Sequence, residues 1–191
     1  MKKNILKTRQ LIQKISLFLI VSLLTGFLGC KKDNDDLTLN QLDKIEFKVV
    51  TMEGDIEREI FDEGTDVAFA IKIVNNSDKD FEWYHDYSCI ILNQEDFLFA
   101  KKKIVQASEY SDISYTPLGK PYPFPVNCPT INLPPQLITP GEERILIKLR
   151  WSDNPDNEEL SAGEYFTEFT LNLTVKEYQK SWNLRTDFII H

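Results

Sequence analysis

The sequence YFTEFTLNLTV at residues 165–175 alternates apolar and polar side chains over most of its length. Successive side chains of a β-strand point to opposite faces, so this alternation predicts a strand with one buried face. Residues 182–190 repeat the pattern, and residues 176–180 form a connection short enough for a hairpin. We therefore expect an antiparallel hairpin. Its inner face is expected to carry Tyr165, Phe169, Leu171, Leu173, Val175, Trp182, Leu184, Phe188 and Ile190.

The same alternation recurs upstream of this hairpin. Residues 44–49, 66–74 and 143–151 each read as a strand. Residues 81–92 read as one or two strands, broken near positions 85–86, and a short candidate lies at 97–99. No segment shows a sustained 3.6-residue apolar period. About seven strands between turn signals predict an all-β, antiparallel sandwich. The run at 143–151 is expected to bury Ile145, Ile147 and Leu149.

Residues 160–165 have the pattern Leu-x-x-Gly-x-Tyr, which resembles the tyrosine corner of immunoglobulin-like sandwiches. In that motif the tyrosine hydroxyl bonds to preceding backbone, so the resemblance implies a structural role for Tyr165. Residues 44–190 as a whole resemble the immunoglobulin-like domains of small bacterial lipoproteins. The antibody-type Cys…Trp…Cys arrangement is absent, which leaves the strand topology open.

A fainter resemblance is to the intracellular proteinase inhibitor type of bacterial β-sandwich. It rests on residues 69–77, 138–142 and 162–165, which contain a strand ending in Val-Asn-x-Ser, a Pro-Gly-Glu turn and a Gly-x-Tyr corner. These segments mark sandwich turns, and the resemblance implies the fold. An export signal conflicts with an intracellular inhibitor, so the activity is not carried over.

The first thirty residues are typical of an export signal. Five basic residues precede an apolar run at 15–28, which is short for a membrane span of about 20 residues. The run ends at Gly29-Cys30, which resembles a bacterial lipobox and implies lipid on Cys30 with removal of residues 1–29. The alternatives are an uncleaved signal anchor, or ordinary secretion with an incidental cysteine.

Residues 31–43 are polar and lack periodicity, so residues 30–43 are predicted to be a lipidated cysteine with its tether, followed by one domain at 44–191. The acidic start of this tether resembles the surface-export signal of Bacteroidetes lipoproteins; the alternative is a simple solvated linker. Together these features predict attachment to the outer membrane, facing the periplasm or the cell surface.

Charge and motif content exclude several classes of function. Without residues 1–29 the chain has 17 basic and 30 acidic residues, a formal charge of −13, which argues against a nucleic-acid partner. Only two histidines are present, and no nucleophile elbow, zinc-protease motif or phosphate loop occurs. We therefore expect no enzyme, no cofactor and no metal.

Cys89 and Cys128 are the only cysteines after Cys30. Export permits a disulfide between them, and this pairing is the prediction. The alternative is two free thiols, buried or on separate strands.

Residues 117–140 contain eight of the nine prolines. Proline lacks a backbone donor, so the run predicts a long, stiff, extended loop instead of a central strand. Tyr122 and Phe124 alternate with these prolines. The loop either covers a sheet edge with both rings packed inward, or binds a partner.

Residues 83–87 gather three aromatic side chains, a histidine and an aspartate, a composition used for sugar or proline recognition. The alternative is a core tryptophan with aromatic neighbours at the edge. A disulfide would draw this stretch toward the proline-rich loop. The sequence thus predicts a shared surface patch for partner binding that comprises Trp83, Tyr84, Tyr122 and Phe124.

Residues 153–159 form an oxygen-rich turn that could attract calcium, but their spacing differs from an EF-hand, and a solvated acidic turn is the better interpretation. The function predicted from the whole sequence is a lipid-anchored, non-enzymatic binding or accessory module for a protein or glycan. The alternatives are a proteinase inhibitor that presents a rigid loop, and a hydrolase with paired carboxylates.

Overall fold

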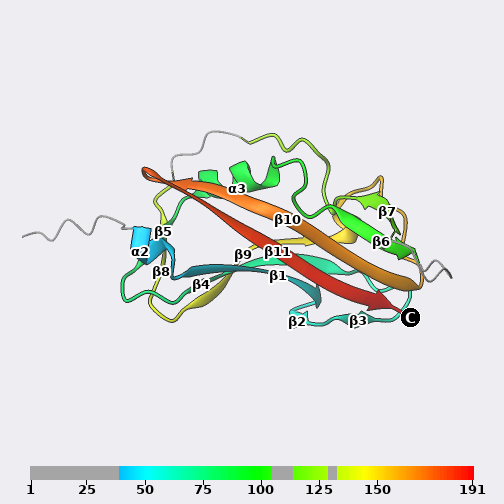
Figure 1. Cartoon of the computed structure of the whole chain (residues 1–191). Coiled ribbons are helices and arrows are strands. Elements are labelled where there is room, and N and C mark those ends of the chain that lie inside the picture. Colours follow the sequence, from blue (N-terminus) through cyan, green and yellow to red (C-terminus); the bar gives the residue numbers. More distant parts are fainter. Residues whose placement is uncertain (1–38, 105–113, 129–132) are drawn as a thin grey trace, which may run out of the picture. The chain divides into compact units, whose positions relative to one another are not determined.

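The computed structural model describes residues 39–104, 114–128 and 133–191 (Figure 1). The chain divides into two compact units, Met1–Leu37 and Thr38–His191, and all described residues belong to the second. The predicted signal segment and Cys30 lie outside the described residues. Within the described part of the chain, no helix has the length and apolar content that a membrane span requires.

Two antiparallel sheets make up most of the second unit, so the all-β prediction is confirmed. The first has the order β2 (Ile56–Glu57), β1 (Ile45–Glu53), β4 (Ala68–Asn75), β9 (Glu143–Arg150). The second has the order β3 (Ile60–Phe61), β11 (Tyr178–Ile190), β10 (Gly163–Val175), β6 (Ala100–Ile104), β7 (Ser114–Gly119). A separate pair joins β5 (Phe81–Trp83) to β8 (Gln136–Ile138). Only β3 and β11 pair in parallel among the described strands.

The two larger sheets lie face to face, with β10 and β11 in front of β1, β4 and β9 in Figure 1. Aromatic rings from the two inner faces meet edge to face. The ring centroids of Phe69 on β4 and Phe188 on β11 are 5.6 Å apart, and those of Phe47 and Trp182 are 4.8 Å apart. Because aromatic side chains bury the largest apolar areas, these pairs hold the sheets together.

The predicted hairpin is confirmed by the register of β10 and β11, which runs from Gly163 opposite Ile190 to Val175 opposite Tyr178. Residues 176 and 177 alone form the turn, which is shorter than the predicted connection. The tyrosine corner is also confirmed: the buried Tyr165 hydroxyl donates to the carbonyl of Ser161. Tyr165 is therefore a fold residue, as the motif implies.

The predicted strand at residues 81–92 is wrong in its second half. The strand β5 stops at Trp83, and residues His85–Leu92 form the helix α3. The tyrosine and isoleucine residues that favour a strand here are overridden by packing and by an acidic residue, Asp86, in the first helical turn, where it complements the helix dipole.

Two other local predictions need correction. The predicted strand at 97–99 is wrong: residues 95–98 form a turn in which Leu98 has a positive φ of 51°, and Phe97 and Leu98 are both buried instead of alternating. A bulge in β9 brings Ile147 opposite Ile71 but Ile145 opposite Lys72, which turns Ile145 outward.

The predicted tether is also too long. Residues Leu39–Leu42 form a short helix, α2, with Leu42 fully buried. The Lys180 ammonium donates to the carbonyl of Leu42 at 3.0 Å. The folded unit therefore begins before residue 44.

Candidate functional site

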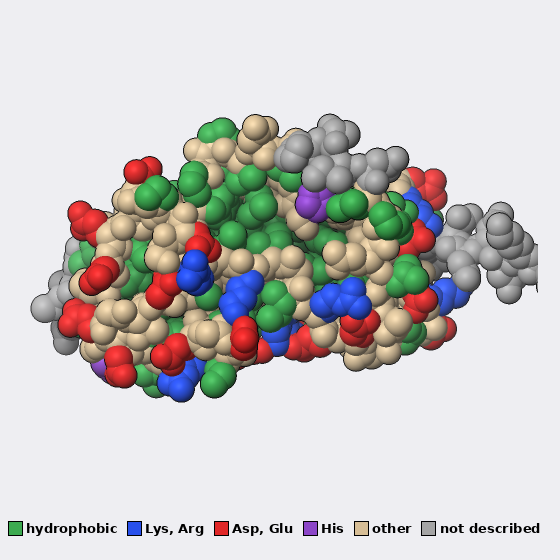
Figure 2. Space-filling view, turned by 180° about the vertical axis from the view of Figure 1, so that it is seen from behind, with side chains coloured by type: hydrophobic (Ala, Val, Ile, Leu, Met, Phe, Trp, Pro, Cys, Tyr) green, Lys and Arg blue, Asp and Glu red, His purple; other side chains and the backbone are tan. Residues whose placement is uncertain are grey.

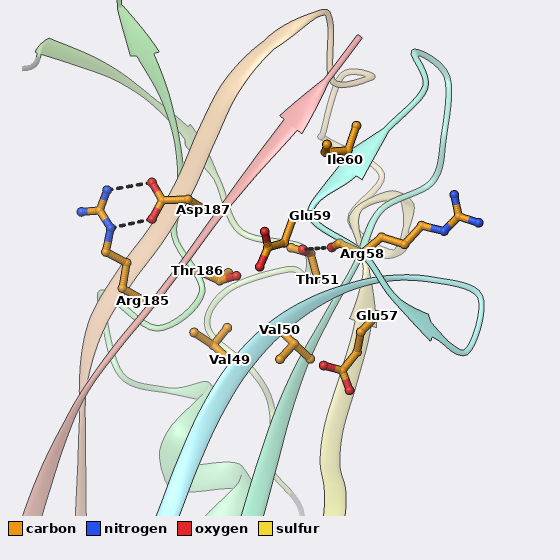
Figure 3. Close-up of a pocket in the computed structure, with 10 residues that line it drawn as sticks. All are labelled: Val49, Val50, Thr51, Glu57, Arg58, Glu59, Ile60, Arg185, Thr186 and Asp187. Carbon is orange, nitrogen blue, oxygen red and sulfur yellow. Dashed lines mark hydrogen bonds and ion pairs between the residues drawn. The ribbon is translucent and has the colours of Figure 1, made fainter.

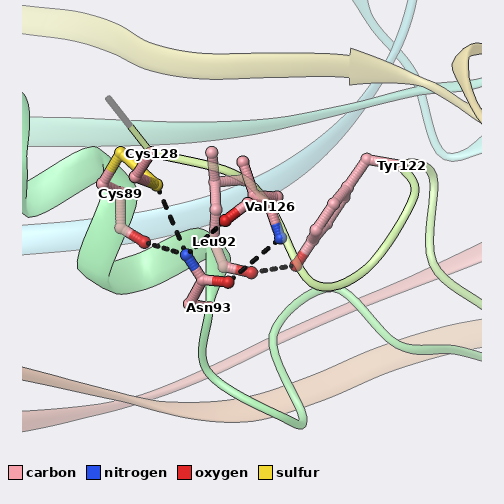
Figure 4. The surroundings of a disulfide bond; sticks show 6 residues. All are labelled: Cys89, Leu92, Asn93, Tyr122, Val126 and Cys128. Carbon is pink, nitrogen blue, oxygen red and sulfur yellow. Dashed lines mark hydrogen bonds between the residues drawn. A yellow bond between two sulfur atoms is a disulfide. The ribbon is translucent and has the colours of Figure 1, made fainter.

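The predicted disulfide between Cys89 and Cys128 is present, with the two Cα atoms 5.9 Å apart (Figure 4). Cys89 lies on α3, and Cys128 lies in the proline-rich segment. The bond therefore fastens this segment to the helix. The predicted loop at 117–140 is only partly irregular, because its ends belong to β7 and β8.

Side chains reinforce this attachment (Figure 4). The Asn93 amide donates to the Val126 carbonyl at 3.2 Å and accepts from the Val126 N–H at 3.0 Å. The Tyr122 hydroxyl donates to the Leu92 carbonyl at 2.7 Å, and burial raises the pKa of Tyr122. The segment 120–128 therefore lies as a strap against the end of α3.

The predicted four-ring surface patch is wrong in its composition. Trp83 is 2% exposed and Tyr122 is 5% exposed, whereas Tyr84 is 36% and Phe124 is 46% exposed. Trp83 lies on the inward-facing side of β5, with its ring centroid 5.7 Å from that of Phe47.

The two exposed rings also belong to different ends of α3. Tyr84 caps the start of the helix, whereas the strap is bound at Leu92 near its end. An eight-residue helix spans about 12 Å. The ammonium of Lys120 lies 4.0 Å from the Phe124 ring centroid, a distance typical of a cation–π contact. Partner binding at either ring remains a prediction.

The acidic turn at residues 153–159 supports the strap. Its Asn154 and Asn157 amides both donate to the carbonyl of Lys120, at 3.0 and 2.9 Å. These amide groups therefore have a structural role, because they hold the start of the strap. Among residues 39–104, 114–128 and 133–191, no three histidine, cysteine or acidic side chains are placed to hold a metal ion.

A cleft of about 900 Å³ opens where the edges of the two sheets meet (Figure 3). The first sheet contributes β1 and β2, and the second contributes β3 and β11. Its lining consists of Val49, Val50, Thr51, Glu57, Arg58, Glu59, Ile60, Arg185, Thr186 and Asp187. Sequence reasoning did not find this site, because its residues come from strand edges far apart in the chain.

Hydrogen bonds between chain segments close both ends of the cleft. At one end the chain crosses from β2 to β3, and the N–H of Arg58 donates to the Thr51 carbonyl at 3.0 Å. The Thr51 hydroxyl returns a bond to the Arg58 carbonyl at 2.5 Å. At the other end the Trp182 indole donates to the Ile45 carbonyl at 3.0 Å. The cleft lies between these two ties.

Most charged groups of the cleft are already paired. Arg185 binds Asp187 through two hydrogen bonds, at 2.8 and 2.9 Å. Together with Lys103, it lowers the pKa of Asp187 to about 2. Glu57 is bound by Lys72, and Arg58 lies 3.1 Å from a carboxylate of Glu53.

Glu59 is the exception among the described carboxylates that line the cleft, because no described cation lies within ion-pair distance of it. Figure 3 shows its side chain between the strand that carries Thr186 and the strand that carries Thr51, while Arg58 extends away. The cleft therefore holds one uncompensated negative charge.

The face seen from behind shows lysine, arginine and acidic side chains interspersed around a hydrophobic hollow (Figure 2). Ion pairs in the first sheet include Lys72 with Glu143 and Lys148 with Asp55. Such exposed pairs neutralise the charge of that sheet locally. The cleft with the exposed Glu59 carboxylate is therefore the candidate binding site among the described residues.

Comparisons with known proteins give no relative: no family model, curated protein or solved structure matches this chain.

Proposed function

We propose that the protein is a lipid-anchored, non-enzymatic binding module with an immunoglobulin-like sandwich fold, and that it holds a protein partner in the cell envelope. The strand order supports the fold assignment. The order β1-β4-β9 corresponds to strands A, B and E of that fold, and β11-β10-β6-β7 corresponds to G, F, C and C′. The tyrosine corner at the start of β10 falls where strand F begins.

The placement in the envelope is supported by the export signal, the Gly29-Cys30 step and the disulfide. Structural disulfides persist in oxidising compartments and are rare in the cytosol. The bond between Cys89 and Cys128 therefore fits a protein that acts outside the cytoplasm.

The observation that carries the binding function is the cleft between β1 and β11, with the uncompensated carboxylate of Glu59. A ligand with a cationic group would gain a charge-assisted contact there. The remaining polar lining supplies further hydrogen-bonding groups from two sheets. A site of this kind suits recognition of a polypeptide.

Site-specific photo-crosslinking of the whole chain in its native envelope tests the proposal. A photoreactive residue replaces Ile60, which is exposed and lines the cleft. Leu137 on β8 is similarly exposed and lies outside the lining, so it is the matched control position. A discrete protein adduct is expected from position 60 and not from position 137. The same pattern from both positions, or none from position 60, contradicts the proposed function.

A further inference from the structure

The outer edge of β11 has free backbone groups. The N–H groups of Ile189 and His191 donate to Glu59 and Phe61, so the odd-numbered residues of β11 point away from β10. Backbone groups alternate in direction along a strand. The same edge therefore presents the N–H and C=O groups of Asn183, Arg185 and Asp187, and no described strand pairs with them.

The chain itself shows that this edge accepts another strand. The strand β3 pairs in parallel with the last residues of β11, through Ile60 opposite Ile189 and Phe61 opposite Ile190. It leaves the edge at Glu59, where the chain turns toward β1. Between Trp182 and Glu59, residues 183–187 of the edge then run for about 17 Å at 3.4 Å per residue, which accommodates a strand of about five residues.

The two charged side chains on this stretch, Arg185 and Asp187, are bound to neighbouring side chains of the same sheet. Proteins usually block exposed edges with charged groups that discourage pairing. Here Arg185 binds Glu168 on β10 at 2.7 Å and also binds Asp187, so both charges are engaged along the sheet. In the part of the chain that the structure describes, the edge between Trp182 and Glu59 is thus left open.

The edge of β1 on the other side of the cleft has the same character. The carbonyls of Ile45 and Thr51 point outward, since they accept bonds from Trp182 and Arg58. By alternation, the backbone groups of Phe47 and Val49 between them point outward as well. An extended chain paired with β11 would therefore face the polar backbone groups of β1.

The charge of the cleft favours one kind of segment as the strand that pairs with β11. The only unpaired charge described in the cleft is the carboxylate of Glu59, at the end of the open edge. The chain after residue 29 carries a formal charge of −13, so a second copy would bring further negative charge. A partner segment with a basic side chain complements the site instead.

We propose that an extended segment of a partner protein adds to the edge of β11 as a strand, opposite residues 183–187, and places a lysine or arginine against Glu59. This rests on the proposed function and deepens it. Backbone bonds to β11 supply affinity, and the basic residue sets the position of the segment, as in other strand-addition complexes.

A library of random nine-residue peptides, selected on the whole chain in mild detergent, tests this mode of binding. Enriched peptides are expected to alternate in pattern and to carry lysine or arginine. Hydrogen exchange with the strongest peptide should slow within residues 181–188. The same peptide N-methylated at alternate positions should lose binding, because it cannot donate to the edge.

Matched variants test the role of the charge. Glu59→Gln should weaken the peptide by about two- to fivefold, the range expected for an exposed ion pair. Glu177→Gln, in the exposed turn of the hairpin, should leave affinity unchanged. A failure to enrich any peptide, equal binding by the N-methylated form, or equal affinity for the Glu59→Gln variant overturns the proposal.

The two proposals fail in different ways. An adduct from position 60 without slowed exchange at residues 181–188 keeps the binding function and refutes strand addition. Slowed exchange that persists after removal of the peptide would assign the edge to another segment of this chain, which also refutes a partner strand.

Discussion

Removal of the disulfide should cost about 4 kcal/mol of unfolding free energy. The bond joins residues 39 positions apart. In the chain-entropy model, closing a loop of that length lowers the entropy of the unfolded chain by about 13 cal/mol/K, which corresponds to about 4 kcal/mol at 25 °C. Domains of this size are stable by only about 5–15 kcal/mol, so the loss would be a large fraction of the total.

The variant Cys89→Ala/Cys128→Ala should nevertheless fold. The Asn93 bonds to Val126 and the bond from Tyr122 to Leu92 do not depend on the sulfur atoms. These contacts keep the strap in place, so the effect should arise chiefly in the unfolded state.

Urea unfolding, followed by tryptophan fluorescence and circular dichroism, measures the difference. The oxidised chain should unfold at higher urea than the double variant, and the reduced chain should match the variant within about 1 kcal/mol, the usual uncertainty of such extrapolations. A loss below about 1 kcal/mol would refute the entropic reasoning. Transitions that differ between the two probes would instead show that the strap unfolds separately.

Three further changes have expected outcomes. Cys30→Ser should abolish incorporation of a fatty-acid analogue; unchanged labelling would refute lipidation at this residue. Thr167→Val should raise stability by about 1 kcal/mol in the same urea assay, because the buried Thr167 hydroxyl has no hydrogen-bond partner among the described residues; a loss of similar size would contradict this. Arg185→Gln should move the Asp187 carboxyl pKa from about 2 toward 3.8 in an NMR titration. Since the pKa is lowered on folding, the stability that this carboxylate contributes is full above about pH 4 and is lost as pH falls through about 2, so the stabilities of the wild type and Asp187→Asn should converge there.

Local patterns predicted the hairpin and the tyrosine corner because both are decided by nearby residues. Alternation along 165–175 and 182–190 leaves one register that places the alternating apolar side chains on the inner face, and a one-residue slip would turn them outward. The bond from Tyr165 to Ser161 spans only four residues. Such features need no knowledge of the other sheet.

The helix α3 could not be found in this way. Its sequence, HDYSCIIL, contains aromatic and β-branched residues that favour strands, and only Ile91 is fully buried. Contacts with residues far away in the sequence hold this helix, among them the disulfide from Cys89 and the strap bound at Leu92. The exposed aromatic patch failed for a related reason: alternation with Phe81 places Trp83 on the inner face of β5, and aromatic composition alone does not distinguish a buried ring from an exposed one.

The cleft shows what alternation omits. It predicts which face of a strand is buried, but it does not say whether the strand has a neighbour on each side. The strands β1 and β11 are more than 120 residues apart, and each lacks a full-length neighbour on the side where they meet. The short segment from Glu57 to Ile60 crosses between the sheets and leaves the carboxylate of Glu59 in the gap. The candidate site therefore arises from pairing that stops short, and a change that extended β3 along β11 should remove it while leaving the core intact.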